Sequence, residues 1–281
     1  MKLPNKYMLA DWFSAALQTS LKCRRYATWG RPMKLLMPCM ACFQELGQPT
    51  NEFASLEFRD DGRYEICCSR GHKSVTVLQQ QKFEILFDIG ANAILDGYYR
   101  EAASSFTSSL ERFYEFCLKV LCKKRGIKTD VFSTAWKQVS NQSERQLGAF
   151  LFLWASEFGE VPQLLSSKNA GFRNSVIHKG KIPTKEEALE YGNTVLAIIR
   201  PKIVQLRSEC DDQIREVTFE HIRDCSNVGE GQVAGGTMCA NTIVSLTAAE
   251  EKHNSQTLEE ALTGILKWRN IVESTEGITK L

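Results

Sequence analysis

The sequence predicts a mainly α-helical protein, in which an antiparallel helical bundle follows a small β-hairpin unit. Two pairs of metal-binding residue types flank an alternating stretch near the N-terminus. From about residue 78, hydrophobic residues recur with the helical period, and start and stop signals divide this region into four or five helices. We therefore divide the 281 residues into an N-terminal extension, a β unit, a bundle and a C-terminal extension, with bounds 1–36, 37–77, 78–212 and 213–281.

The composition is that of a globular chain, with 43% hydrophobic and 24% charged residues. A formal net charge of +2 excludes a strongly basic protein that coats nucleic acid, so any RNA must be met by a local patch. No run of 18 uninterrupted apolar residues predicts a membrane helix, and we identify no signal peptide. The ten irregularly spaced cysteines favour cytoplasmic thiols and one metal site over a disulfide framework.

The β unit carries two short turns that each offer two metal ligands. Cys39 and Cys42 form a C-x-x-C turn, and Cys68 and His72 form a C-x-x-G-H turn. Four soft ligands of these types suit tetrahedral Zn²⁺, and a closed set of four leaves no open position for catalysis. We therefore expect a structural zinc in a zinc ribbon. The alternative is a set of unrelated core cysteines near an exposed histidine.

The stretch between the two turns predicts a hairpin. Apolar and polar residues alternate on both sides of Asp61-Gly62, a typical two-residue hairpin turn. Cys67 and Cys68 would lie on opposite faces of the second strand, so only one of them is expected to bind the metal. We favour Cys68, because Gly71 then permits the bend that returns His72 to the metal.

The bundle begins with two helices separated near Gly97, the second of which carries a long apolar stripe. Further helices are predicted at 147–159 and 163–179. The last one starts at a capping box formed by Thr184 and Glu187 and should run to about Ile199, where Pro201 breaks or kinks it.

One short segment of the bundle, GFRNSVIHKGKIP, contains residues suited to cutting RNA. Arg173 and His178 are five residues apart, about 140° around a helix, whereas Asn174 and His178 share a face. Gly180 marks the helix end, so His178 lies in the last turn, where the helix dipole favours its cationic form. An arginine can hold a phosphate and a histidine can move a proton. On spacing alone, a structural histidine at a helix end is the alternative.

The motif R-N-x-x-x-H, followed by glycine and I-P-T-x-E-E-A, resembles the signature of the HEPN superfamily. The resemblance covers about residues 80–212 and is most specific over Phe172–Ala188. It implies a metal-independent endoribonuclease in which Arg173 and His178 are catalytic and Asn174 is a polar neighbour. The implied reaction is attack by a ribose 2′-OH that leaves a 2′,3′-cyclic phosphate. The family also implies a homodimer with a composite active site.

A zinc ribbon before such a domain resembles a bacterial subgroup of uncharacterised or defence-associated proteins. We therefore expect a toxin or antiviral effector with RNA as substrate and a regulatory protein as a further partner. Two other interpretations stay open. One is a non-catalytic dimeric module that binds nucleic acid or protein, and the other is a nucleotide-binding or antitoxin-like regulator. Glu111 is a candidate acidic partner for Arg173 or His178, with a solvent-facing glutamate as the alternative.

The C-terminal extension fits the bundle poorly. We expect a flexible loop at 228–236, a short strand at 242–246 and an amphipathic helix at 257–273. The remaining candidate metal ligands show no recognisable spacing for a second metal site: Cys210, Cys225, Cys239, His221 and His253.

Overall fold

The computed structural model describes residues 35–47, 53–68, 70–226, 234–248 and 251–276. The predicted N-terminal extension, 1–36, lies outside these ranges except for its last two residues. Residues 34–281 form one compact unit that is mainly helical, so the predicted β unit, bundle and C-terminal extension contact one another.

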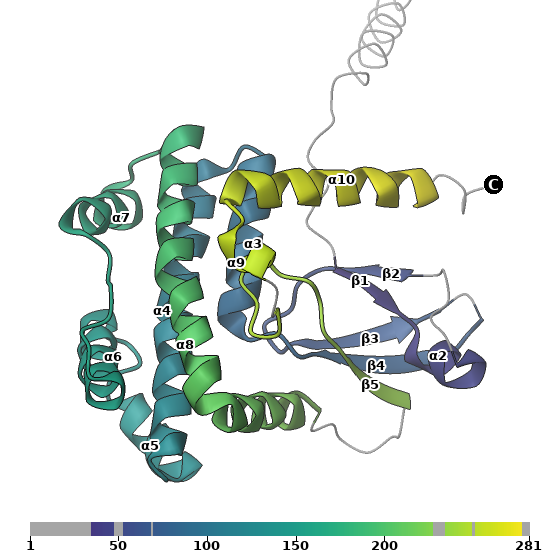
Figure 1. Cartoon of the computed structure of the whole chain (residues 1–281). Helices are drawn as coiled ribbons and strands as arrows, with labels where there is room; N and C mark the ends of the chain where they lie inside the picture. Colours follow the sequence, from purple (N-terminus) through teal and green to yellow (C-terminus); the bar gives the residue numbers. More distant parts are fainter. Residues whose placement is uncertain (1–34, 48–52, 69, 227–233, 249–250, 277–281) are drawn as a thin grey trace, which may run out of the picture. The chain divides into compact units, whose positions relative to one another are not determined.

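The bundle is organised around one long central helix, α4 (Tyr99–Lys124), which packs mainly against four others (Figure 1). These are α3 (Lys82–Leu95), α6 (Ser143–Phe158), α7 (Ser167–Lys179) and α8 (Lys185–Ser226), with the short α5 (Thr129–Lys137) beside the end of α4. Gly97 separates α3 from α4 with a positive φ of 83°, as predicted. Aromatic side chains fill the core, including Phe83, Phe106, Phe113, Phe150 and Trp154.

The prediction that the last bundle helix ends near Ile199 is wrong, because α8 continues to Ser226. Pro201 lies inside it, and the Lys202 amino group donates to the Ile198 carbonyl at 3.1 Å in the turn that the proline disturbs. Buried residues on both sides of Pro201 hold the helix against α4, and its direction changes only at Cys210. The bundle therefore extends past the predicted boundary at 212. Helix α5 was not among the predicted helices.

Two small sheets precede and flank the bundle. β1 (Leu35–Pro38) pairs antiparallel with β2 (Phe53–Leu56), and the short helix α2 (Met40–Leu46) follows β1. β3 (Arg63–Cys67) pairs antiparallel with β4 (Lys73–Leu78), which pairs in parallel with β5 (Ala234–Met238).

The predicted hairpin around Asp61-Gly62 is not confirmed. A turn does form there, since Gly62 has a φ of 62° and its N–H donates to the Arg59 carbonyl at 3.2 Å. However, β2 takes β1 as its partner and β3 takes β4, so the two flanking strands belong to different sheets. The hairpin lies one turn later, where Cys68 to His72 connect β3 to β4.

The C-terminal residues add to both the sheets and the helical bundle. Most of the predicted loop at 228–236 lies outside the described residues, and its last three residues begin β5. Residues 242–246, predicted as a strand, form a buried irregular segment instead. The backbone N–H groups of Ile243 and Leu246 donate to Asp88 and Glu84 on α3, both at 2.9 Å, so carboxylates replace a strand partner. We call residues 240–248 the docking segment.

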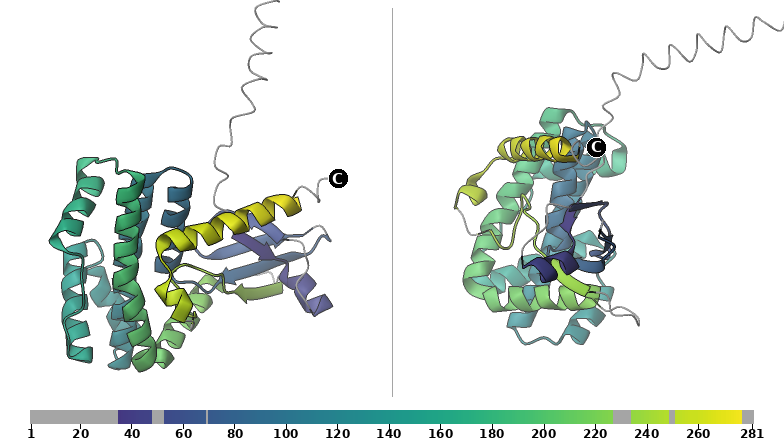
Figure 2. Two further views of the ribbon diagram at one scale, coloured as in Figure 1. Left: turned by 45° about the horizontal axis from the view of Figure 1, so that its top comes forward. Right: turned by 90° about the vertical axis from the view of Figure 1, so that its right-hand side faces the viewer.

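After α9 (Glu251–Ser255), the predicted amphipathic helix is present as α10 (Leu258–Glu276). It starts beside α8 and runs past α3 (Figures 1 and 2), and it buries Leu258, Ala261 and Leu262.

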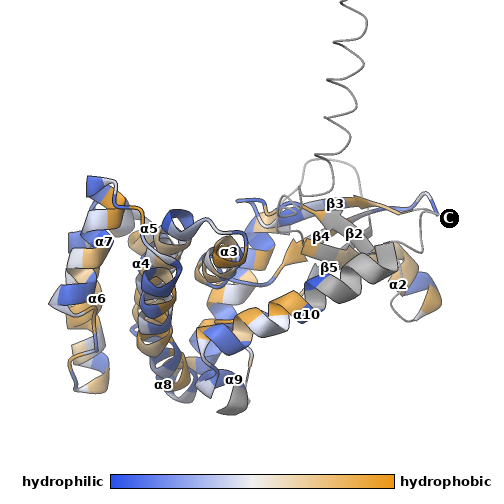
Figure 3. Ribbon diagram, turned by 90° about the horizontal axis from the view of Figure 1, so that it is seen from above, coloured by the Kyte–Doolittle hydropathy of each residue, from blue (hydrophilic) through white to orange (hydrophobic). Residues whose placement is uncertain are grey.

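Helix α3 separates two hydrophobic cores, and its ribbon is largely coloured as hydrophobic (Figure 3). Phe83 and Phe87 face the bundle core, whereas Ile85 packs on a smaller core between the strands. That smaller core consists of Leu35, Met37, Tyr64, Ile66 and Leu78. Among the described helices, none combines the length and the hydropathy needed to cross a membrane.

Candidate functional site

Helix α7 positions the predicted catalytic residues. It begins at Ser166, whose hydroxyl accepts from the Asn169 N–H at 3.3 Å, and it ends at Gly180 with a φ of 72°. The N–H groups of Gly180 and Lys181 both donate to the Ser175 carbonyl, which closes the last turn. His178 therefore lies in the last turn of the helix, as predicted.

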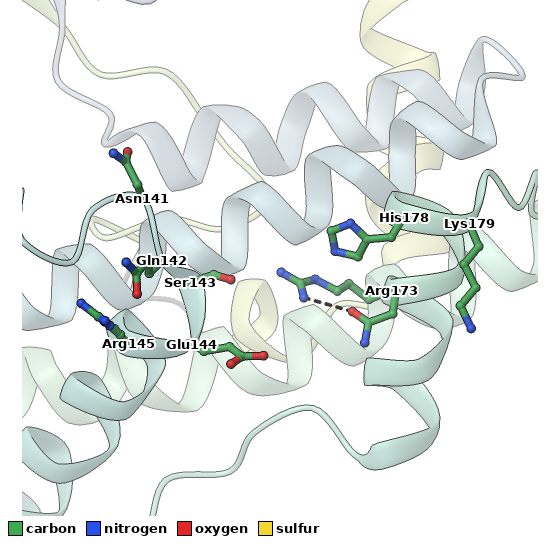
Figure 4. Close-up of a pocket in the computed structure, with 9 residues that line it drawn as sticks. Asn141, Gln142, Ser143, Glu144, Arg145, Arg173, His178 and Lys179 are labelled. Atoms are coloured by element: carbon green, nitrogen blue, oxygen red, sulfur yellow. Dashed lines mark hydrogen bonds between the residues drawn. The ribbon is translucent and has the colours of Figure 1, made fainter.

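The structure brings Arg173, Asn174 and His178 to one cleft of about 680 Å³. In Figure 4, the side chains of Arg173 and His178 both point towards the start of α6. Their separation around the helix does not keep them apart, because the arginine is long and His178 is exposed at the helix end. The cleft is open to solvent.

Arg173 is held in place from two directions. Its guanidinium donates to Glu111 of α4 at 2.5 Å and to the Asn174 side-chain oxygen at 3.1 Å. Arg173 and Glu111 are both partly buried, with 24% and 30% of their side chains exposed, so the ion pair is shielded in part from solvent. Glu111 is therefore a partner of Arg173, which decides between the two interpretations of this glutamate.

The opposite wall of the cleft was missed by the sequence analysis. It is formed by the residues that precede and begin α6: Asn141, Gln142, Ser143, Glu144 and Arg145. Helix α6 starts without a side-chain cap, so its first N–H groups remain free to bind an anion. Within the described ranges, neither Arg145 nor Lys179, a further lining residue, pairs with a carboxylate. The signal in the sequence was only a short polar run between two apolar helices.

The four predicted metal ligands also converge. Cys39 and Cys42 lie at the start of α2, and Cys68 and His72 lie on the turn from β3 to β4. Their ligand atoms all lie within 4.8 Å of one another. Cys67 is exposed and is not part of the group, whereas Cys68, the cysteine favoured from the sequence, is one of its four members.

The spacing of these atoms fits a tetrahedral metal ion. Four ligands at about 2.3 Å from a common centre lie about 3.8 Å apart. The Cys42 sulfur is 3.7 Å from the Cys68 sulfur and 3.3 Å from His72 Nδ1. Both cysteines are free, since a disulfide would bring the sulfurs to about 2.0 Å. The cluster could therefore hold a metal ion.

The thiols of this cluster interact strongly. Burial raises the pKa of Cys39, but hydrogen bonds from the Cys42 N–H and from neighbouring side chains lower it to about 7 overall. The pKa of Cys42 is raised to about 11 by burial and by the adjacent thiols of Cys68 and Cys39. Two or three thiolates this close together repel one another. A dication at the centre of the cluster would offset that repulsion, because thiolates are among its preferred ligands.

The other candidate metal ligands do not assemble into a second site. Among the described residues, the group around Cys42 is the one set of three or more His, Cys, Asp or Glu side chains that could hold an ion. Cys225 and His221 contact each other, but His221 Nε2 lies 3.0 Å from the Leu78 carbonyl.

Comparisons with known protein families, with curated proteins and with solved structures find no match to this chain.

Proposed function

We propose that this chain is a metal-independent endoribonuclease of the HEPN type that acts as a cytoplasmic toxin or antiviral effector. The observation that supports it best is the convergence of Arg173 and His178 on one open cleft. The residues that line this cleft are distinct from those of the metal cluster, and the proposal assigns the reaction to Arg173 and His178.

Each residue has a chemical role in the proposed reaction. A base removes the proton of a ribose 2′-OH, and the 2′ oxygen then attacks the adjacent phosphorus. The bond from phosphorus to the 5′ oxygen breaks, and an acid protonates the leaving oxygen, which leaves a 2′,3′-cyclic phosphate. Arg173 stabilises the charge on the phosphoryl oxygens, and His178 transfers a proton. Glu111 and Asn174 orient the guanidinium.

The reaction needs an acid and a base on opposite sides of the phosphorus, whereas one cleft supplies a single histidine. Of the chain's four histidines, His178 alone lines this cleft. We therefore propose a homodimer in which two copies of α7 face each other and each His178 serves one of the two roles. Light scattering coupled to gel filtration would measure the mass, and a strict monomer that still cuts RNA would contradict this arrangement.

The first prediction concerns RNA cleavage. Purified protein mixed with total RNA should produce fragments with cyclic-phosphate ends, with EDTA added at the start of the reaction. His178→Ala should lower the cleavage rate by at least about 100-fold, since general acid–base catalysis contributes on that order. Circular dichroism should show the same helical content in the variant.

A matched control is Lys185→Ala, which removes a cation near the motif but outside the cleft and should leave the rate unchanged. Cleavage that survives in His178→Ala would refute the assignment. A wild type that binds RNA without cutting it would favour a non-catalytic binding module. One observation favours that rival, because Glu111 neutralises Arg173 in the unbound cleft.

For the metal cluster, we propose a structural Zn²⁺ held by Cys39, Cys42, Cys68 and His72. The set of three thiolates and one imidazole is typical of structural zinc, and four protein ligands leave no position for a reactive water. A unit with so small a core gains much of its stability from such an ion. Elemental analysis should find one zinc per chain, and a folded chain without metal would contradict the proposal.

A further inference from the structure

We infer that Glu45 positions His72 for metal binding and that Arg70 holds Glu45 in place. The inference rests on the proposed zinc site and deepens it, because it assigns the nitrogen that binds the ion and the residues that select it. Neither Glu45 nor Arg70 is a ligand.

The two nitrogens of the His72 ring have different neighbours. Nδ1 faces the cluster, 3.3 Å from the Cys42 sulfur, and Nε2 lies 3.2 Å from a carboxylate oxygen of Glu45. A neutral imidazole carries its proton on one nitrogen and a lone pair on the other. A carboxylate at Nε2 keeps the proton there, so the lone pair is on Nδ1 and points at the metal position.

Arg70 connects this carboxylate to the cluster. One guanidinium nitrogen lies 2.9 Å from the other Glu45 oxygen, and the second donates to the Cys42 sulfur at 3.7 Å. The guanidinium of Arg70 is cationic at any physiological pH. Three thiolates around one dication leave a net charge of −1, and Arg70 brings a positive charge against one of these sulfurs.

The local backbone explains why these residues meet. Cys42 and Glu45 are three residues apart on α2, so their side chains lie on the same face of the helix. Arg70 and His72 flank Gly71, whose φ of 81° makes the tight turn that aims both side chains at α2. Glu45 and Arg70 thus form a second link between the two ligand turns, outside the four ligands themselves.

An exposed ion pair alone would contribute little, since about half of each side chain of Glu45 and Arg70 is accessible to solvent. The Glu45–Arg70 pair acts instead by fixing the orientation of the His72 imidazole. Removing the hydrogen-bond partner of a metal-bound histidine usually weakens metal binding by about 10- to 100-fold. The effect should therefore appear in the metal affinity and in the choice of nitrogen.

The test uses the full chain and Zn²⁺ in competition with a chromophoric chelator. Glu45→Ala should bind Zn²⁺ about 10- to 100-fold more weakly than the wild type. Glu45→Gln keeps an oxygen that can accept from Nε2, so its loss should be smaller. Glu57→Gln, at an exposed glutamate after β2, is the matched control and should bind like the wild type.

Nitrogen-15 NMR of histidine-labelled protein gives a second readout, and only four histidines contribute signals. The zinc-bound wild type should show a metal-bound Nδ1 and a protonated Nε2 for His72. A wild type with Nε2 on the metal would overturn the inference, as would Glu45→Ala with wild-type affinity. A wild type that binds no Zn²⁺ would refute the zinc site itself, which is a different result from a site that binds without help from Glu45.

Discussion

Gly180 determines where α7 ends and therefore where His178 lies. Its φ of 72° is a conformation that costs a residue with a Cβ about 1 kcal/mol or more. We expect Gly180→Ala to lower the free energy of unfolding by about 1 kcal/mol and to reduce RNA cleavage, because the last turn loosens. Urea unfolding and the cleavage assay measure the two effects.

The control for this prediction is in the same helix. Gly171 has helical backbone angles, and a Cβ added there meets no atom within 4 Å. Gly171→Ala should therefore stabilise the protein by about 0.5–1 kcal/mol, since alanine favours the helix. If both variants shift the stability in the same direction, Gly180 is not the residue that ends the helix.

At the scale of residues, the sequence predicts sites whose members lie close together along the chain. The metal ligands and the segment from Arg173 to His178 could be found because each set lies within a few residues of a turn or a helix end. The contact from Glu111 to Arg173 spans 62 residues and could be named only as one of two alternatives, and the wall that begins at Asn141, which was not predicted, comes from another helix. Both depend on how α6 and α7 pack on α4, which no local pattern encodes.

At the scale of elements, Gly192 allows three helices to meet. A Cβ at this position of α8 would lie 2.9 Å from the Phe106 ring of α4 and would overlap Leu258 of α10. We expect Gly192→Ala to destabilise the protein by about 1–3 kcal/mol, because core residues must shift to make room. Urea unfolding measures the loss, with Gly148→Ala as an unobstructed control on α6.

The helices that were predicted correctly carry their own signals. α3, α4, α6 and α10 each carry hydrophobic residues along one face, and α7 is marked by its Ser166 cap and its terminal Gly180. The misassigned elements depend on distant partners. β5 has the sequence AGGTM, which has little strand propensity, and it becomes a strand because β4 offers an open edge. α8 continues past Pro201 because buried residues before and after the proline pack against α4.

At the scale of the whole molecule, two buried acids join α3 to the docking segment. Burial raises the pKa of Glu84 from 4.5 to about 7 and the pKa of Asp88 from 3.8 to about 7. The folded state therefore binds these protons more tightly than the unfolded state. The tighter proton binding by Glu84 and Asp88 adds to the free energy of unfolding. This contribution is complete below about pH 4 and is lost as the pH rises towards 7 and beyond.

We expect the free energy of unfolding to fall by at least about 2 kcal/mol between pH 5 and pH 8 on account of these two groups. Glu84→Gln keeps an acceptor for the Leu246 N–H but has no proton to lose, so it should show a shallower pH dependence than the wild type. Urea titrations at several pH values measure the difference. Equal slopes for the two proteins would contradict the role of Glu84.

The parallel pairing of β4 with β5 also sets an order of events during synthesis. Gln80, just after β4, hydrogen bonds to Ala240, which lies 160 residues further along the chain. A nascent chain on the ribosome carries the metal ligands and the whole of α7 long before β5 has emerged. The edge of β4 and the acids of α3 therefore stay uncovered until β5 and the docking segment have been synthesised. A messenger truncated before β5 would yield an unfinished sheet rather than a smaller working protein.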